Sequence, residues 1–207
     1  MDIKRRRSVS DIVYKYKHNL YINITNKCPN DCEFCDIPKI GQNLGVNLIL
    51  EKEPAYDDIV QSLEKRISSD FKEVVFCGGG EPLMRLDLLL KLASFIKSKY
   101  KINIRLDTCG YPFSFYSGRD VVEALQYMGI DSVSVSVNST TKEKYNKICH
   151  PAIPDAFQKT LDFVKKCKKS ELTTRITFVD YKIDKAKCKE LANKLNVDYY
   201  IRPYSPL

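Results

Sequence analysis

Residues 73–99, EVVFCGGGEPLMRLDLLLKLASFIKSK, combine a short extended run, a glycine-rich turn and a helical pattern. Residues 73–78 have the apolar character of a strand, and apolar side chains return at helical spacing over residues 86–99. Between them, Pro82 suits the first turn of a helix because its backbone angle is already helical. A strand that leads directly into a helix is the building unit of α/β proteins, so this stretch indicates that fold class.

The same alternation extends from this stretch over the rest of the chain. Further extended runs are Leu20–Asn26, Ile102–Thr108, Ser132–Asn138, Thr173–Val179 and Val197–Arg202, and further helical patterns are Ala55–Ile67, Asp120–Met128, Asp155–Lys169 and Lys185–Leu195. Right-handed helical crossovers would join these strands into a largely parallel sheet. A closed eight-stranded barrel usually takes about 250 residues. We therefore expect an α/β fold with an open, partial six-stranded parallel (β/α)6 barrel of the TIM-like type.

The expected organisation is an N-terminal tail over residues 1–19 and a single domain over residues 20–207. Ile12–Lys17 adds a short antiparallel strand before the first parallel one. The basic run Lys4–Arg7 is expected to be a disordered tail, with contact to an anionic partner as the alternative.

Composition narrows the class of protein. The chain has 207 residues, 34 Lys and Arg, 26 Asp and Glu, and eight cysteines, which is below the cysteine content of small disulfide scaffolds. The longest charge-free stretches, Ile40–Leu50 and Thr108–Gly118, are 11 residues each and too short to span a membrane. Because no apolar signal-peptide segment follows the basic run, we expect a cytoplasmic protein with reduced thiols and no membrane partner.

Strand alternation predicts a polar interior for the barrel. In Ser132–Asn138 three valines take one face, and Ser134, Ser136 and Asn138 take the other. The other runs place these polar residues on the matching face: Tyr21, Asn23, Thr25, Asn103, Arg105, Asp107, Arg175, Thr177, Tyr200 and Arg202. Since buried arginines are costly unless paired, we expect a wet cavity that holds a ligand beside cationic groups. The alternative is that several of these residues lie at strand ends in solvent.

Three cysteines stand close together directly after the first extended run. Cys28, Cys32 and Cys35 lie within CPNDCEFC, and residues 29–31 favour a loop over a helix. Zinc would need a fourth ligand, usually from a second Cys or His pair, and the remaining cysteines and histidines are scattered. Three thiolates suit a [4Fe–4S] cluster whose fourth iron stays open for a small ligand. A partial zinc site and a chance spacing are the alternatives.

A second signature, Gly78-Gly-Gly-Glu-Pro82, follows the second extended run. Glycines allow unusual backbone angles and let a ligand approach backbone atoms closely. Taken alone, the segment is equally typical of an ordinary tight turn between a strand and a helix.

Together the two signatures resemble the radical S-adenosylmethionine (SAM) superfamily, whose members carry Cys-x3-Cys-x-aromatic-Cys after the first strand and Gly-Gly-Glu-Pro after the second. Phe34 supplies the aromatic residue. The likeness extends to the short members called TatD family-associated radical SAM proteins. It rests on residues 23–28, 75–82 and 134–138, then Tyr145-Asn146, Cys149 and Pro151, and residues 202–204.

The resemblance implies that Cys28, Cys32 and Cys35 bind the cluster and that SAM chelates the open iron through its amino and carboxylate groups. It also implies a set of SAM-binding residues: Phe34, Gly79, Gly80, Glu81, Thr108, Ser136 and Asn138. Arg175 is assigned to the same cavity from strand alternation, and a bidentate contact to the SAM carboxylate is expected there.

The implied function is that of a radical SAM enzyme. A low-potential donor of the ferredoxin or flavodoxin type would supply an electron, and SAM would be cleaved to methionine and a 5′-deoxyadenosyl radical. The radical would abstract hydrogen from a small-molecule substrate, anionic or related to nucleotides, in an oxidoreductase or lyase reaction. The family name also implies a functional link to a TatD-type nuclease.

Two other functions fit parts of the sequence. One is an activase that places a glycyl radical on a partner protein. The other is a non-enzymatic protein that binds metal or nucleic acid, the latter through Lys4–Arg7.

Overall fold

The computed structural model describes residues 11–204, which form one seven-stranded sheet with sequential strand order, β1 to β7. β1 is antiparallel to β2, and all later pairs are parallel. The strands are β1 (Val13–Tyr16), β2 (Asn19–Ile22), β3 (Glu73–Phe76), β4 (Asn103–Thr108), β5 (Ser132–Ser136), β6 (Thr173–Val179) and β7 (Asp198–Arg202). The six parallel strands and the short antiparallel strand before them confirm the predicted fold class, whereas Lys4–Arg7 lies outside the described residues.

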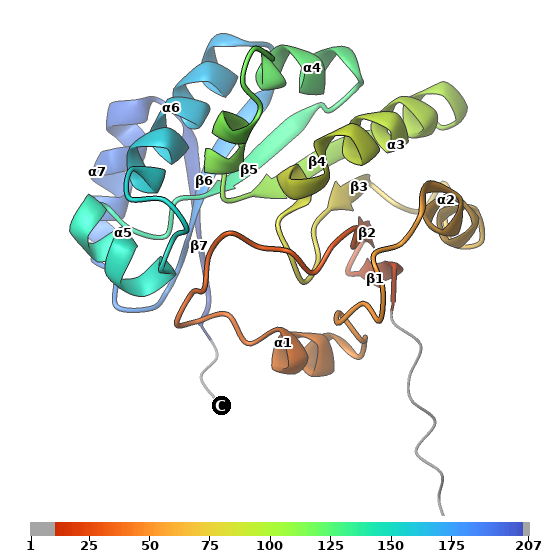
Figure 1. Ribbon diagram of the computed structural model, residues 1–207, viewed down its shortest axis with the longest axis horizontal. Coiled ribbons are helices and arrows are strands. Elements are labelled where there is room, and N and C mark those ends of the chain that lie inside the picture. The colour runs from red at the N-terminus through yellow and green to blue at the C-terminus, as the bar shows by residue number, and fades with distance from the viewer. Residues whose placement is uncertain (1–10, 205–207) are drawn as a thin grey trace, which may run out of the picture.

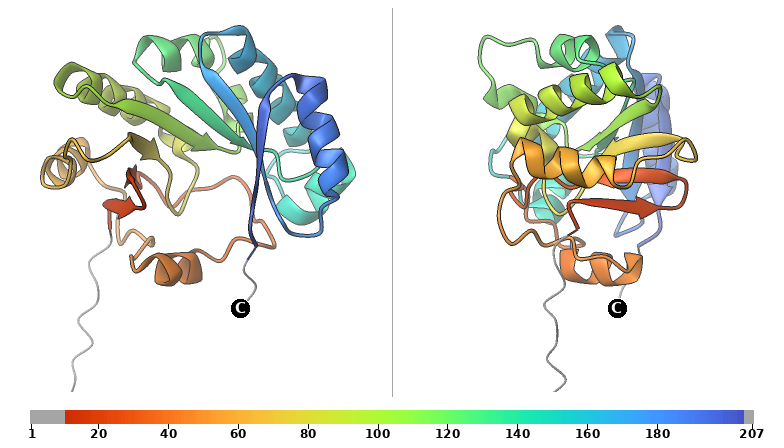
Figure 2. Two further views of the ribbon diagram at one scale, coloured as in Figure 1. Left: turned by 180° about the vertical axis from the view of Figure 1, so that it is seen from behind. Right: turned by 90° about the vertical axis from the view of Figure 1, so that its right-hand side faces the viewer.

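The sheet is curved, and helices cover its convex side (Figures 1 and 2). The α-helices are α1 (Ile37–Leu44), α2 (Tyr56–Glu64), α3 (Leu86–Lys99), α4 (Val121–Tyr127), α5 (Lys142–Cys149), α6 (Ala156–Lys169) and α7 (Lys185–Leu195), with 3-10 helices η1 (Pro82–Arg85) and η2 (Tyr111–Phe115). α1 differs from the others because it lies across the gap between the two edges of the sheet (Figure 1). Within residues 11–204, no helix is long and apolar enough to cross a membrane.

Apolar strand residues face the helices, as the alternation predicts. Val133, Val135, Ile104 and Leu106 are 0–1% exposed and belong to the main core cluster. Their neighbours in the strands point to the concave side, where Arg105 is buried as well. Because β2 to β7 are parallel, their carboxyl ends meet at one rim, and the segments that follow them converge there.

β2, β3 and β5 end earlier than predicted, and in β2 and β5 the residues that follow the strand account for the early end. β2 ends at Ile22, and the Asn23 amide then donates to Leu48 O at 2.8 Å, while the Asn26 amide donates to Leu50 O at 2.7 Å. β5 ends at Ser136 because Asn138 adopts a left-handed backbone conformation, with φ of 54°. These departures occur at the rim, where the chain leaves regular structure to form the site.

Two helices, α1 and α5, were not predicted. α1 contains Gly41, which weakens a helical pattern, whereas Pro38 lies in the first turn, where proline is tolerated; Asp36 accepts a hydrogen bond from Lys39 N, and Gly45 ends the helix with φ of 70°. α5 begins after Thr141, whose hydroxyl accepts from Lys144 N. Both are eight-residue helices with a side-chain N-cap.

Candidate active site

The three clustered cysteines lie on an irregular loop, residues 28–36, which we call the cysteine loop. It is hydrogen-bonded to the end of α5: Asp31 N donates to Cys149 O at 3.0 Å, and Glu33 N donates to Ile148 O at 2.9 Å. Ala152 N in turn donates to Pro29 O at 2.8 Å. A segment more than 100 residues downstream therefore fixes the conformation of the cysteine loop.

Two buried tyrosines, Tyr111 and Tyr145, hydrogen-bond to the same loop. The Tyr111 hydroxyl donates to Pro29 O at 2.6 Å and lies 3.0 Å from Asn30 Oδ1. The amide of Asn30 donates to the Tyr145 hydroxyl at 3.3 Å, and both tyrosines are fully buried. Sequence reasoning did not assign a role to Tyr111 or Asn30. The Tyr145-Asn-x-x-Cys stretch was noted in the sequence without a role. The structure shows that Tyr145 and Cys149 both hydrogen-bond to the cysteine loop.

The Gly78–Pro82 segment, here the glycine loop, lies directly against the start of the cysteine loop. Glu81 N donates to Lys27 O at 2.8 Å, and Gly79 N donates to Asn23 Oδ1 at 3.2 Å. A Cβ atom on Gly80 would lie only 2.6 Å from Lys27 O and from Thr25 O. The glycine loop thus needs its glycines for close packing of one backbone against another.

The Glu81 carboxylate is buried and fully hydrogen-bonded. It accepts from Thr108 Oγ1 at 2.6 Å, from Cys109 N at 2.7 Å and from Leu83 N at 2.9 Å. Burial raises the pKa of Glu81, and the three donors oppose that rise. Glu81 and Thr108, both predicted to bind SAM, are therefore paired with each other, which fixes the positions of the glycine loop and the end of β4 relative to each other.

Ser136 and Asn138 lie at the end of β5. The Ser136 hydroxyl accepts from Arg202 Nη2 at 3.2 Å and lies 3.4 Å from Thr177 Oγ1. The Asn138 side-chain oxygen accepts from Val179 N at 3.3 Å, so this side chain joins β5 to β6 at the rim. Ser136 faces the concave side with a half-exposed hydroxyl, whereas Asn138 is buried.

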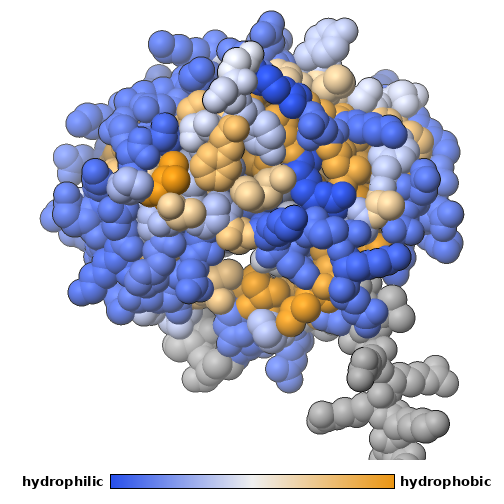
Figure 3. Space-filling model, in the orientation of Figure 1, coloured by the Kyte–Doolittle hydropathy of each residue, from blue (hydrophilic) through white to orange (hydrophobic). Residues whose placement is uncertain are grey.

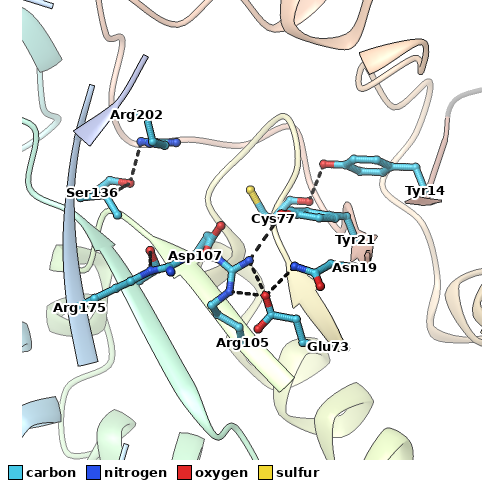
Figure 4. Close-up of polar contacts among 12 residues, drawn as sticks. Tyr14, Asn19, Tyr21, Glu73, Cys77, Arg105, Asp107, Ser136, Arg175 and Arg202 are labelled. Carbon is cyan, nitrogen blue, oxygen red and sulfur yellow. Dashed lines mark hydrogen bonds and ion pairs between the residues drawn. The ribbon is translucent and has the colours of Figure 1, made fainter. Parts of the chain in front are cut away.

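The concave side of the sheet is polar, as Figure 4 shows. Arg105 is held by Glu73 at 3.0 Å and by Asp107, and its guanidinium lies 3.5 Å from the Tyr21 hydroxyl. Arg175 Nε donates to Ser134 Oγ at 3.0 Å. Of the predicted interior residues, these are buried: Asn23, Thr25, Arg105, Ser134, Asn138 and Thr177. By contrast, Asn103 and Arg202 are exposed at strand ends, which was the alternative interpretation, and Tyr200 is exposed in the middle of the edge strand β7.

A cavity of about 620 Å³ opens between the cysteine loop, α1 and the end of β7. Phe34, Cys35, Ile40, Arg202 and Tyr204 contribute to its walls. Figure 3 shows a hollow in this face of the molecule next to α1, with apolar side chains around it. The cavity therefore joins the thiol of Cys35 to the guanidinium of Arg202 across an apolar surface.

The donor set of the cysteine loop fits an iron–sulfur cluster better than a single metal ion. In the part of the chain that the structure describes, no three Cys, His, Asp or Glu side chains are close enough to hold one ion. A [4Fe–4S] cluster makes a different demand, because each thiolate binds a different iron and the three sulfur atoms stay apart. Cys28 and Cys35 are exposed, and a bound cation would favour their thiolates.

A comparison with models of protein families identifies the family. A model of the radical SAM superfamily matches residues 22–195. The chain is 27% identical over 163 residues to the GTP 3′,8-cyclase of Aliarcobacter butzleri, a match that covers 79% of this chain and 46% of that protein. It is 31% identical over 138 residues to the probable GTP 3′,8-cyclase of Pyrobaculum aerophilum, with 67% and 40% covered. The chain thus spans less than half the length of these relatives.

Solved structures show the same fold at low sequence identity. Streptococcus suis SuiB bound to S-adenosylmethionine superimposes with a TM-score of 0.65 at 18% identity, over 93% of this chain and 42% of that one. Methylornithine synthase superimposes with a TM-score of 0.65 at 14% identity, over 91% and 53%. At these identities the likeness supports the fold alone.

Proposed function

Because the chain belongs to the radical SAM superfamily, whose members use a [4Fe–4S] cluster and SAM, we propose that it is an enzyme that binds both and abstracts hydrogen from an anionic substrate. When bound, the cluster and SAM supply one-electron chemistry that produces a 5′-deoxyadenosyl radical. We assign this activity to a single domain over residues 20–207.

The observation that carries the proposal is the hydrogen bond from Glu81 N to Lys27 O at 2.8 Å, which joins the glycine loop to the residue before Cys28. The two segments are about 50 residues apart in sequence, and neither needs the other to form a turn. Their contact places the glycine loop against the start of the cysteine loop. A cofactor that touches both a cluster and a backbone loop requires this arrangement.

The chain's own residues divide into ligands and supports. We propose that Cys28, Cys32 and Cys35 hold the cluster and that Gly79 and Gly80 present backbone groups to the SAM amino group. Glu81 supports that contact with a carboxylate already held in place by Thr108.

The side walls of the SAM site are proposed from the cavity and the rim. Phe34, which lines the 620 Å³ cavity, offers a ring next to Cys35. The hydroxyl of Ser136 is directed to the concave side, and Asn138 keeps the adjoining backbone in its left-handed conformation.

The substrate is proposed to be an anionic small molecule. Three arginines lie on the concave side or at its rim, and relatives that share about 30% identity carry the name GTP 3′,8-cyclase. A nucleotide is accordingly the first candidate to test. The proposed partners are a low-potential electron donor and this small molecule, and the association with a TatD-type nuclease stays a prediction.

The proposed compartment is the reducing cytoplasm, since all eight cysteines are free.

Anaerobic reconstitution tests the proposal. We expect three to four irons per chain, an electron paramagnetic resonance spectrum that changes when SAM is added, and 5′-deoxyadenosine after reduction with dithionite. Cys32→Ala should lose the iron and the product. Cys188→Ala is the matched control, because Cys188 is buried on α7 and should keep both. Tight zinc with no iron in the wild type would overturn the proposal.

A further inference from the structure

Arg175 is the arginine on the concave side whose binding capacity is unused. Its Nε donates to Ser134 Oγ at 3.0 Å, which fixes the plane of the guanidinium. Within residues 11–204, no hydrogen-bond or ion-pair partner is found for its Nη1 and Nη2 atoms. The side chain is half-buried, on β6 next to β5 (Figure 4). An oriented guanidinium with two free terminal nitrogens is suited to a bidentate contact with a carboxylate or phosphate.

Arg105 does not offer the same opportunity. Glu73 and Asp107 both pair with it, so its charge is more than neutralised. Arg105 therefore has a structural role, because an anion that approached it would be repelled by the carboxylates of Glu73 and Asp107.

Arg202 differs from Arg175 by its height in the sheet. Its backbone pairs in register with Val179, four residues beyond Arg175 on β6, and its guanidinium contacts Ser136, which lies about 7 Å along β5 from the Ser134 that holds Arg175. Arg202 lines the cavity beside Cys35. Arg202 is therefore the arginine close to the cysteine loop.

SAM carries one carboxylate, and the cysteine loop would hold the cluster to which SAM would bind. Arg202 is positioned to serve that group at the rim, which leaves the deeper arginine without a role in cofactor binding. We infer that Arg175, oriented by Ser134, binds an anionic group of the substrate, a carboxylate or a phosphate, in place of the SAM carboxylate that strand alternation suggested for it. This inference rests on the proposed function and names the substrate contact that it leaves open.

Binding to the reconstituted protein, saturated with SAM, tests this role without relying on turnover. Three probes are titrated by calorimetry: GTP, inorganic pyrophosphate and citrate, so that nucleotide, bare phosphate and carboxylate are distinguished. Because the contact would be a charge-assisted hydrogen bond, we expect Arg175→Ala to weaken binding of the probe by about 10- to 100-fold. SAM affinity, measured by equilibrium dialysis, should change less than about twofold. Arg175→Lys, which keeps the charge but cannot make a bidentate contact, should have a probe affinity between those of the wild type and Arg175→Ala.

Two further variants separate the outcomes. Ser134→Ala should weaken the probe about five- to tenfold, because Arg175 keeps its charge and loses its orientation. Arg66→Ala, at an exposed arginine after α2, should leave both affinities unchanged. The inference is wrong if Arg175→Ala weakens SAM as much as the probe, if it leaves every probe bound as in the wild type, or if the wild type binds none of them.

Failure of the proposed function would look different from failure of this inference. Without a cluster or 5′-deoxyadenosine in the wild type, the proposed function fails. A probe that still binds this protein, and whose binding is lost in Arg175→Ala, would then show an anion site in a protein of another activity.

Discussion

Replacing Gly80 by alanine tests whether the close contact between the glycine loop and the cysteine loop is essential. The new Cβ would lie 2.6 Å from Lys27 O and from Thr25 O, below the 3.0 Å that real Cβ atoms respect. The two segments must therefore separate by about 0.4 Å, and both obstacles are backbone atoms. Overpacking of this kind costs about 1–3 kcal/mol, and disruption of the hydrogen bond from Glu81 N adds about 1 kcal/mol.

The expected loss of unfolding free energy is thus about 2–4 kcal/mol, or about 5–15 °C in melting temperature for a chain of this size. Urea denaturation followed by circular dichroism measures the loss, and iron content after reconstitution reports the site. Gly118→Ala is the control: its Cβ meets nothing within 4 Å, and only its φ of +75° is unfavourable, at about 1 kcal/mol. Equal losses for the two variants, with full iron in Gly80→Ala, would refute the reasoning.

Three other variants probe the supports of the site. Tyr111→Phe removes the hydroxyl that donates to Pro29 O, so we expect a loss of about 1 kcal/mol and about fivefold faster iron release to a chelator, measured by absorbance. Arg105→Ala leaves two carboxylates without their cation and should cost about 3 kcal/mol in urea denaturation; an unchanged midpoint would contradict the pairing. Cys149→Ala, at a fully buried thiol, should keep its iron, whereas Cys32→Ala should not. Iron loss from both would make Cys149 a ligand.

The strands could be predicted because their signal is local. In β5 and β6, apolar and polar residues alternate, and the buried and concave faces follow that alternation. Thr173–Val179 and Lys185–Leu195 have the predicted boundaries, since β6 is a regular central strand and α7 has clear caps at Asp184 and Asn196.

The contacts that hold the cysteine loop in place could not be predicted, because they join segments that are distant in the sequence. Nothing near Asn30 in the sequence indicates that its side chain lies between Tyr111 and Tyr145. Which arginine is paired with carboxylates could not be predicted either. Alternation placed Arg105 and Arg175 on the same face, and only the structure shows that Arg105 is neutralised and Arg175 is not.

The distance in sequence between the cysteine loop and its support has a consequence for the order of events during synthesis. Asn30 and Tyr145 are separated by 115 residues, and Cys32 and Cys149 by 117. At about 5–20 residues per second, a ribosome needs about 6–23 s to make the support after the three cysteines have been translated. Until then the cysteine loop lacks its support from α5, although the glycine loop and Tyr111 have already been translated. The fold therefore favours late delivery of the metal centre, to a chain whose α5 has already formed.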